Sequence, residues 1–585
     1  MSENTKDTEP TETPASEEPT EAPAGQDAPK EENMVMGPDG QMMSKKAYKK
    51  LMKKQEKDKK KAEYKSKQEQ DKPDAKEEGV EEYVKDPNDP CAHLFGDTDL
   101  IRSTIDPEER FAKKYHRVKQ LVEELKGEEI TVRGRVHRVT GKGGACFIVL
   151  RESFYTCQAC IFVDETITKN MVEYCRRIPR ESMVQIKGVV QVPENPIKKC
   201  SQPVEVLIKE IWTLHKSEPR LPFNLDDASN LVKDQTKEDH QDDEEDKQES
   251  GKKKEIIIGQ NVRLDNRIVD LRVPANQAIL RVSGGVCRFF REYFISQDFT
   301  ELHSPKIIGG TSEGGSEVFR LKYFGQDACM AQSPQLYKQM GVVCDLERVF
   351  EIGPVFRAED SNTPRHLCEF TGLDYEMSFY DHYFEVLDVA CNMFEYLFKN
   401  LFEHYSKEIE VVREQYPFED FVFKTPVPRI KFNEACEMLS EAGMEQNPHK
   451  DLETKCEKEL GRIIKEKYGT DFFLVYDYPI EARPFYTMLN PHDSKYTNSF
   501  DFFMRGEEIS SGAQRIHDPE ELKERAIEHG IPPDTIKDYI ECFKYGSYPH
   551  GGGGIGLERV VKLFLGIHNI RKCSMFPRDP KRLTP

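Results

Sequence analysis

The sequence predicts an α+β protein in which a small β-barrel precedes one large domain of helices and strands. Five short runs of alternating apolar residues cluster between residues 128 and 220, and the stretch 261–585 mixes helical periodicity with aromatic strands. The length also indicates more than one domain, because 585 residues correspond to roughly four domains of average size. A single small binding module is therefore excluded.

Amino-acid composition excludes several classes of protein and indicates the cellular compartment. The net charge of −20 excludes a surface that is basic throughout, so any patch for nucleic acid is local. No run approaches the length of a membrane span, and the N-terminus lacks the basic and apolar regions of a signal peptide. The 15 cysteines have no regular spacing, which is typical of reduced thiols. We expect a cytoplasmic protein that does not bind a membrane.

Charge changes sign along the N-terminal region. Residues 1–43 are rich in Pro, Thr, Glu, Ala and Asp and are expected to be a disordered acidic tail. Residues 44–70 hold twelve lysines against four acidic residues and predict a basic amphipathic helix. Its basic face includes Lys45, Lys46, Lys49, Lys50, Lys53 and Lys54. Residues 71–127 are expected to form a linker and a lead-in helix.

The predicted barrel occupies residues 128–220. Its five strand candidates are EITVRGRVHRV, ACFIVLRE, YTCQACIFV, SMVQIKGVVQV and PVEVLIKEIWTL, separated by turn residues. Five short strands in a segment of this length indicate an OB-like barrel. Residues 221–260 are strongly acidic without apolar periodicity, which predicts a solvated linker.

A strand, a polar turn and a second strand are predicted in VFEIGPVFRAEDSNTPRHLCEFTGLDYEM. Arg357 and Glu359 lie two apart and share a face of the first strand. By the same parity Phe370, Asp374 and Glu376 share a face of the second strand. A guanidinium suits a phosphate, an aromatic ring suits a purine, and carboxylates suit an amine or Mg²⁺. The alternative is an ordinary hairpin with a surface salt bridge.

A glycine run precedes a helix in PHGGGGIGLERVVKLFLGI. The helix is predicted by apolar residues at helical spacing, namely Leu557, Val560, Val561, Phe564 and Leu565. Glycines permit close approach of a ligand to the backbone, and Arg559 in the first turn adds charge suited to a polyphosphate. The segment is not a P-loop, because G-K-[ST] is missing. A plain loop is the alternative.

Together, FRAE with the downstream HLCEF and the later GGGIGLER resemble motifs 2 and 3 of class II aminoacyl-tRNA synthetases. FFREYFISQDFTELHSPKI resembles motif 1, which places Pro305 at a homodimer interface. The five strands resemble the anticodon-binding OB-fold of subclass IIb, whose members charge aspartate, asparagine or lysine. TSEGGSEVF, AQSPQLYKQM, RGEEISSGAQRIHD and SMFPRDPKRLTP resemble the eukaryotic aspartate-specific branch along nearly all of residues 100–585. This resemblance implies a catalytic domain built on an antiparallel sheet flanked by helices.

The resemblance also implies a reaction and its residues. ATP and L-aspartate would form aspartyl-adenylate, and the aspartyl group would pass to the 3′-OH of tRNA. Aspartate would be bound by Ser312, Glu313, Gln335, Lys338, Asp374, Ser511 and Arg515. ATP would be bound by Arg357, Glu359, His366, Phe370, Glu508, Gly556 and Arg559, with Arg357, Glu359 and Arg559 as catalytic groups. Mg²⁺ would lie at Glu508 and Ser511. Two cations, Lys338 and Arg515, suit an anionic side chain.

For tRNA, Phe147, Gln158 and Glu205 match positions that stack on and read the anticodon. Phe147 could equally be a core residue of the barrel. The lysine-rich helix resembles an extension that grips tRNA phosphates, whereas its residues alone also fit a solvated helix or a binder of anionic membranes. Pro364 stands where many relatives have histidine and is expected to stiffen the motif 2 loop.

Two other functions remain open on the sequence. One is an asparagine-specific synthetase, against which Lys338 and Arg515 count. The other is an inactive scaffold that binds RNA or proteins, against which the complete set of motif arginines and Mg²⁺ positions counts. Homodimerisation is expected from motif 1, and membership of a multi-synthetase complex is a further possible partnership.

Overall fold

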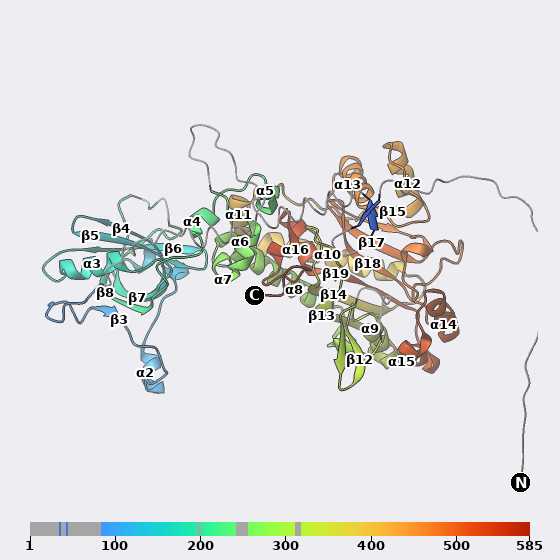
Figure 1. The fold of residues 1–585 in the computed structure, drawn as a ribbon, viewed down its shortest axis with the longest axis horizontal. Coiled ribbons are helices and arrows are strands. Elements are labelled where there is room, and N and C mark those ends of the chain that lie inside the picture. The colour runs from blue at the N-terminus through green and yellow to red at the C-terminus, as the bar shows by residue number, and fades with distance from the viewer. Residues whose placement is uncertain are drawn as a thin grey trace, which may run out of the picture. The chain divides into compact units, whose positions relative to one another are not determined.

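Figure 1 shows the protein as a computed structural model, which describes residues 83–195, 197, 200–240, 256–310 and 318–585 and two short strands before them. The chain divides into two compact units, Met1–Val84 and Lys85–Pro585. In the first unit β1 (Met34–Met36) pairs antiparallel with β2 (Met42–Ser44). The expectation of a disordered tail through residue 43 and a helix from residue 44 is wrong for these strands. The predicted lysine face (Lys45, Lys46, Lys49, Lys50, Lys53 and Lys54) lies outside the described residues.

Each of the five segments predicted as a strand of the barrel forms a strand, within a sheet of six strands. The five are β4 (Glu129–Lys142), β5 (Ala145–Glu152), β6 (Tyr155–Phe162), β7 (Met183–Gln191) and β8 (Glu205–His215). Their pairings run from β4 through β5, β6, β8 and β7 back to β4, which closes the sheet. Alternate residues such as Ile148 and Leu150 are buried, as expected for strands with one face inside. The sequence did not predict β3 (Phe95–Asp97), parallel to β8, or α3 (Lys169–Arg177) between β6 and β7.

The acidic segment after the barrel is more ordered than predicted. It contains α4 (Leu225–Ala228) and α5 (Thr236–His240). Phe223, Leu225 and Val232 are buried, so the prediction of a solvated linker is wrong up to residue 240. Asp226 lies 3.1 Å from His137 Nε2 and 3.0 Å from Arg138 Nη2 of the barrel. The few apolar residues were outnumbered by acids, and their contacts join segments far apart in the sequence.

An eight-stranded sheet forms the centre of the second domain. Its order is β15 (Arg429–Lys431), β16 (Phe472–Tyr476), β17 (Ser499–Met504), β18 (Glu507–Gln514), β19 (His550–Gly556), β14 (Glu369–Ser378), β13 (Arg348–Phe356) and β9 (Thr300–Glu301). The six central strands are antiparallel, as implied, and both edge pairs are parallel. The glycine run is therefore a central strand, not a loop.

Three helices cover one face of this sheet. They are α8 (Pro274–Ser296), α10 (Phe384–His404) and α16 (Leu557–Phe564), and they share one core with the inner face of the strands. Phe290, Phe294 and Phe350 pack there as aromatic pairs. The predicted helix after the glycines is thus confirmed, the motif 1 segment begins within the long helix α8, and Pro305 is exposed beyond β9.

The structure has further helices and a second, smaller sheet (Figure 1). They are α2 (Pro107–Ala112), α6 (Gln260–Asp265), α7 (Arg267–Asp270), α9 (Gln335–Gly341), α11 (Ser406–Gln415), α12 (Phe432–Glu441), α13 (Thr454–Tyr468), α14 (Pro519–Glu528), α15 (Lys537–Cys542), the short 3₁₀ helix η8 (Ile570–Cys573), and a small sheet of β10 (Ile307–Ile308), β11 (Arg320–Tyr323) and β12 (Gln326–Met330). Within the described ranges, no helix is both long and apolar enough to cross a membrane. All 15 cysteines are free thiols.

Candidate active site

A cavity of about 570 Å³ lies on the face of the sheet opposite the helical core. Alternate residues of β14 face opposite sides of the sheet: Leu373 and Tyr375 point into the core, and Asp374 and Glu376 point the other way. The cavity is lined by β14, β17, β18 and β19, the loop after β13 and the start of α16. The following residues with expected roles line it: Gln335, Arg357, Glu359, His366, Phe370, Asp374, Glu508, Ser511, Arg515, Gly556 and Arg559.

Two cations are paired with two carboxylates at one end of the cavity, where Asp374 and Arg515 line it and Lys338 and Glu376 are buried behind them. Lys338 Nζ lies 3.0 Å from Asp374 Oδ1 and 3.5 Å from Glu376 Oε2. Arg515 donates from Nε and Nη2 to the two carboxylate oxygens of Glu376, at 2.8 and 3.1 Å. Burial by itself would raise the pKa of Glu376, but Arg515 and Lys338 bring that pKa below its usual value. Glu376 is therefore charged, and these ion pairs hold the four side chains in place.

The glycine strand makes this arrangement possible. A Cβ added at Gly552 would lie 2.1 Å from the carbonyl oxygen of Tyr375 and 2.4 Å from Glu376 Oε2. The carbonyl of Gly552 accepts from Arg515 at 2.9 Å, and that of Gly553 accepts from Lys338 at 3.1 Å. The sequence predicted close approach of a ligand here. The structure shows close approach of the cavity's own side chains.

A neutral layer supports this cluster from behind. Gln335 Nε2 donates to Gln339 Oε1 at 3.0 Å and contacts Glu376 Oε2 at 3.4 Å. Burial lowers the pKa of His550 to about 4, so its ring is neutral. Because the carbonyl of Tyr548 can only accept, Nδ1 of His550 donates to it at 2.9 Å, and Nε2 accepts from Gln339 at 3.0 Å.

The other end of the cavity carries arginines and an aromatic ring. The Arg357 guanidinium lies 5.6 Å from the ring centroid of Phe370. Strand β13 ends at Phe356, so Arg357 and Glu359 lie in the loop, and their predicted place in the strand is wrong. Burial and the charges of Arg559 and other nearby arginines lower the pKa of His366 to about 4. This end therefore presents fixed positive charge beside a neutral imidazole.

Acidic side chains lie next to these arginines. Asp501 stands opposite Ser511 in the pairing of β17 with β18, and Arg483 donates to both, at 2.7 and 2.6 Å. Burial and Asp501 raise the pKa of Glu508, and the same two causes raise the pKa of Asp451. Oδ1 of Asp501 is buried without a hydrogen-bond partner among the described residues. Glu508 and Asp451 therefore lack sufficient compensating charge.

Sequence reasoning missed Asp501 and Arg483, and it placed Glu376 on the correct face without including it among the aspartate-binding residues. A signal for Asp501 existed, because it is an acid inside SFDFFM, a strand whose six residues are all buried. Its neighbours Phe500 and Phe502 point into the core, which directs Asp501 to the cavity. Arg483 lies in a connection without periodic pattern, and only the tertiary structure brings it to the site. Ser312 and Glu313 lie outside the described residues.

The expected anticodon residues share the outer face of the barrel. Phe147 is half-buried, whereas its neighbours Cys146 and Ile148 are fully buried, so it is not a core residue. Gln158 and Glu205 are register partners, and Gln158 Nε2 donates to Glu205 Oε2 at 2.9 Å. Phe147 packs edge-on against Phe162 with centroids 5.8 Å apart. A ring and a polar pair therefore lie on adjacent strands.

Known families and proteins match this architecture. Residues 259–580 match the family of tRNA synthetases class II (D, K and N), and residues 130–214 match an OB-fold nucleic acid binding domain. Aspartate–tRNA ligase 1, cytoplasmic, of Arabidopsis thaliana is 46% identical over 506 residues, covering 86% of this chain and 92% of that protein. The cytoplasmic aspartate–tRNA ligase of Homo sapiens is 48% identical over 486 residues, covering 83% and 94%.

Solved structures agree with these sequence matches. The aspartyl-tRNA synthetase from Entamoeba histolytica superposes with a TM-score of 0.76 at 42% identity, covering 86% of this chain and 98% of that one. The asparaginyl-tRNA synthetase from Pyrococcus horikoshii complexed with asparaginyl-adenylate gives 0.68 at 27% identity, covering 81% and 99%. The chain belongs to the class II aminoacyl-tRNA synthetases of the D, K and N group, and it is homologous over most of its length to cytoplasmic aspartate–tRNA ligases.

Proposed function

We propose that this synthetase is an aspartate–tRNA ligase. It activates L-aspartate with ATP, releases pyrophosphate, and transfers the aspartyl group to the 3′-OH of the terminal adenosine of its tRNA, releasing AMP. The observation that carries the choice of amino acid is the buried pair Lys338 and Arg515 beside Asp374 and Glu376. Its named relatives are aspartate–tRNA ligases called cytoplasmic, which supports the same substrate and a cytoplasmic location.

Uncompensated positive charge does not explain how this site would reject asparagine. Both cations already have carboxylate partners, so asparagine would not leave them uncompensated. Lys338 and Arg515 are nonetheless donors only. Within the described residues, none accepts from Nη1 of Arg515, which leaves that nitrogen for a carboxylate oxygen of the substrate. An asparagine NH₂ would meet these donors without a partner, a loss of about 1–3 kcal/mol.

ATP is assigned to the arginine end of the cavity. We place the adenine on Phe370, the α-phosphate beside Arg357 and the γ-phosphate beside Arg559, with Glu359 and His366 alongside and Gly556 at the start of α16. The neutral His366 can donate or accept without adding charge. Arg559 is held by the backbone carbonyl of Glu508 at 2.8 Å, which orients its remaining N–H groups. Because Arg559 is held before substrate arrives, it can stabilise developing charge on the phosphates with little reorganisation.

The acidic side chains fit a magnesium ion bound together with ATP. Among the described residues, no three His, Cys, Asp or Glu side chains form a complete metal site. Mg²⁺ in nucleotide sites usually has only one or two carboxylate ligands and completes its shell with phosphate and water. The orphaned Oδ1 of Asp501 and the raised pKa of Glu508 are the signs of a missing cation. We assign Glu508, Asp501 and Ser511 to it, and when bound it would neutralise phosphate charge.

The chain's own residues then account for the first step. Asp374 and Gln335 line the cavity at this end and can hold the substrate ammonium, with Ser312 and Glu313 assigned to the loop that closes over it. The α-carboxylate is already a nucleophile, so no general base is required. Arg357 orients the α-phosphorus for in-line attack and neutralises charge as pyrophosphate leaves. Catalysis is positioning combined with electrostatic stabilisation.

The tRNA contacts and the dimer complete the proposal. Phe147, Gln158 and Glu205 are assigned to the anticodon, because a half-buried ring and a polar pair are what unstacked bases require. The six lysines Lys45, Lys46, Lys49, Lys50, Lys53 and Lys54 are assigned to tRNA phosphates, and the exposed Pro305 to a homodimer interface. Association with other synthetases is a further expected partnership.

ATP–pyrophosphate exchange with Mg²⁺ tests the amino-acid assignment directly. Aspartate is expected to support exchange, while asparagine and lysine are not. Exchange with asparagine would overturn the role of Lys338 and Arg515. Absence of exchange with every amino acid would favour an RNA-binding scaffold. Charging of a tRNA transcript then tests the second step, and Phe147→Ala is expected to impair charging while leaving exchange unchanged.

A further inference from the structure

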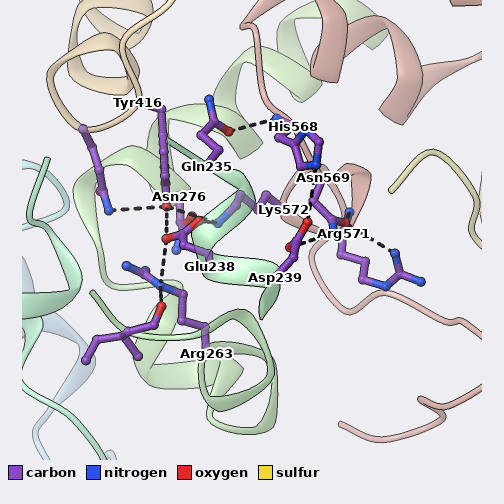
Figure 2. Close-up of polar contacts among 12 residues, drawn as sticks. Gln235, Glu238, Asp239, Arg263, Asn276, Tyr416, His568, Asn569, Arg571 and Lys572 are labelled. Carbon is purple, nitrogen blue, oxygen red and sulfur yellow. Dashed lines mark hydrogen bonds and ion pairs between the residues drawn. The ribbon is translucent and has the colours of Figure 1, made fainter. Parts of the chain in front are cut away.

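The acidic segment after the barrel places two carboxylates deep in the catalytic domain. Glu238 on α5 has no exposed side-chain surface and forms an ion pair with Lys572, which lies more than 300 residues away in sequence. Arg263 Nε lies 3.5 Å from the same carboxylate, and the Tyr416 hydroxyl donates to it at 3.5 Å. Figure 2 shows Glu238 extending from α5 toward this polar cluster, while Asp239 extends toward Asn569 and His568. A solvated linker would need none of these contacts.

Neighbouring residues on the same segment bind the start of η8. Asp239 Oδ1 accepts from Asn569 Nδ2 at 3.1 Å, and Oδ2 lies 3.5 Å from His568 Nε2. Gln235 bridges the backbone, donating to the carbonyl of Gly566 at 3.0 Å and accepting from the His568 amide at 2.9 Å. Figure 2 shows these partners side by side. Segment 235–239 therefore holds the chain on both sides of residue 568.

The far side of η8 holds the motif 2 loop. Arg571 donates to the Thr363 carbonyl at 2.9 Å and to Asn362 Oδ1 at 2.8 Å. The Ile570 amide donates to the Pro364 carbonyl at 2.8 Å. Thr363 Oγ1 in turn lies 2.7 Å from Nδ1 of His366, which lines the cavity. One short helix thus contacts α5 on one side and the ATP-site loop on the other.

We propose that α5 is a strap that positions the motif 2 loop through η8, with Glu238 and Asp239 as positioning residues for the nucleotide end of the cavity. Asn569 is the shared element, because its amide donates to Asp239 while its Oδ1 accepts from the Arg571 backbone amide at 3.1 Å. Loss of the strap frees η8 and then the loop. The aspartate cluster, built on β14 and β19, shares none of these contacts. This inference rests on the proposed function only in the tests that measure enzyme activity.

The first test compares Asp239→Asn with Asp234→Asn in the full-length protein. Asp234 is exposed on the same segment and caps α5 locally, and asparagine can keep that cap. Asp239→Asn is expected to raise KM for ATP in pyrophosphate exchange by about 3- to 10-fold and leave KM for aspartate within about twofold. Asp234→Asn is expected to change neither. Equal changes in both KM values, or none, would overturn the positioning role.

A second test follows the loop without any substrate. Amide hydrogen exchange in residues 357–368 is expected to accelerate in Asp239→Asn and more strongly in Glu238→Gln, but not in Asp234→Asn. Unchanged protection of the loop would refute the strap even if the variants were less stable. Because this readout needs no aspartate activation, it distinguishes failure of the strap from failure of the proposed function.

A double-mutant cycle tests the route through η8. Arg571→Lys weakens the contact between η8 and the loop, so adding Asp239→Asn to it is expected to raise KM for ATP by less than about 1.5-fold further. Multiplication of the two single effects would show that Asp239 does not act through Arg571 and would overturn the proposed route.

Discussion

The two ends of the catalytic cavity differ in how their charges are satisfied. At the aspartate end two cations face two carboxylates within 3.5 Å, and burial holds the set in one geometry. At the phosphate end Glu508 and Asp451 have raised pKa values and Asp501 has an orphaned oxygen among the described residues. The first end is complete before substrate arrives. At the second end, buried carboxylates repel one another, and a cation bound with ATP can relieve this repulsion. Neutralising a carboxylate is therefore expected to have different effects at the two ends.

The largest effect is expected from removing a cation at the complete end. Arg515→Leu leaves Glu376 buried with only Lys338 opposite it, and aspartate-dependent pyrophosphate exchange is expected to fall by a factor of about 10³ or more. Arg462→Leu on the exposed face of α13 is the control and is expected to retain exchange. Retention of exchange by Arg515→Leu would contradict the proposed side-chain clamp.

A neutralising substitution at each end gives the direct comparison. Glu376→Gln breaks a buried ion pair and is expected to lower the free energy of unfolding by about 3–5 kcal/mol. Glu508→Gln removes a repelling charge and is expected to leave that free energy unchanged or raise it by about 1 kcal/mol. Denaturant unfolding without substrate measures both, and equal losses would show that the two ends do not differ.

Glycine substitutions test the close packing beneath the aspartate end. Gly552→Ala forces a Cβ against the Tyr375 carbonyl and Glu376, and is expected to lower the free energy of unfolding by at least about 2 kcal/mol. At Gly556 in the same strand, an added Cβ meets only Arg559 Cβ at 3.6 Å. Gly556→Ala is therefore expected to stay within about 0.5 kcal/mol. Similar thermal shifts for both variants would mean that the strand is not close-packed.

The smallest expected effect is on pH dependence. Burial and Glu508 raise the pKa of Glu457 to about 7, from a usual value near 4.5. The folded protein therefore binds more protons than the unfolded chain between these values, and this contribution to stability is lost as pH rises through about 7. Between pH 5 and pH 7.5 the unfolding free energy of wild type is expected to fall about 1–2 kcal/mol more than that of Glu457→Gln. Parallel profiles would show that Glu457 is not perturbed.

The sequence by itself determined the elements with strong local patterns. Alternation placed all five barrel strands, and apolar spacing placed α16, because one face of each element must be buried. Parity in β14 correctly grouped Phe370, Asp374 and Glu376 on one face, and most of the residues that motif resemblance named for ATP and aspartate line the cavity. Each of these features depends on residues close together in the chain.

Only the tertiary structure decided the rest. The glycine run became a central strand because β14 and β18 supply its partners, and no local pattern in glycine encodes a strand. Asp501 and Arg483 meet across segments without a shared motif. Glu238 is buried because Lys572 and Arg263 compensate its charge. Both cations are distant in sequence, so the acidic run around Glu238 does not indicate that they pair with it. Whether two charges pair depends on their distance in the folded protein, whereas local sequence patterns reflect only residues that are close together along the chain.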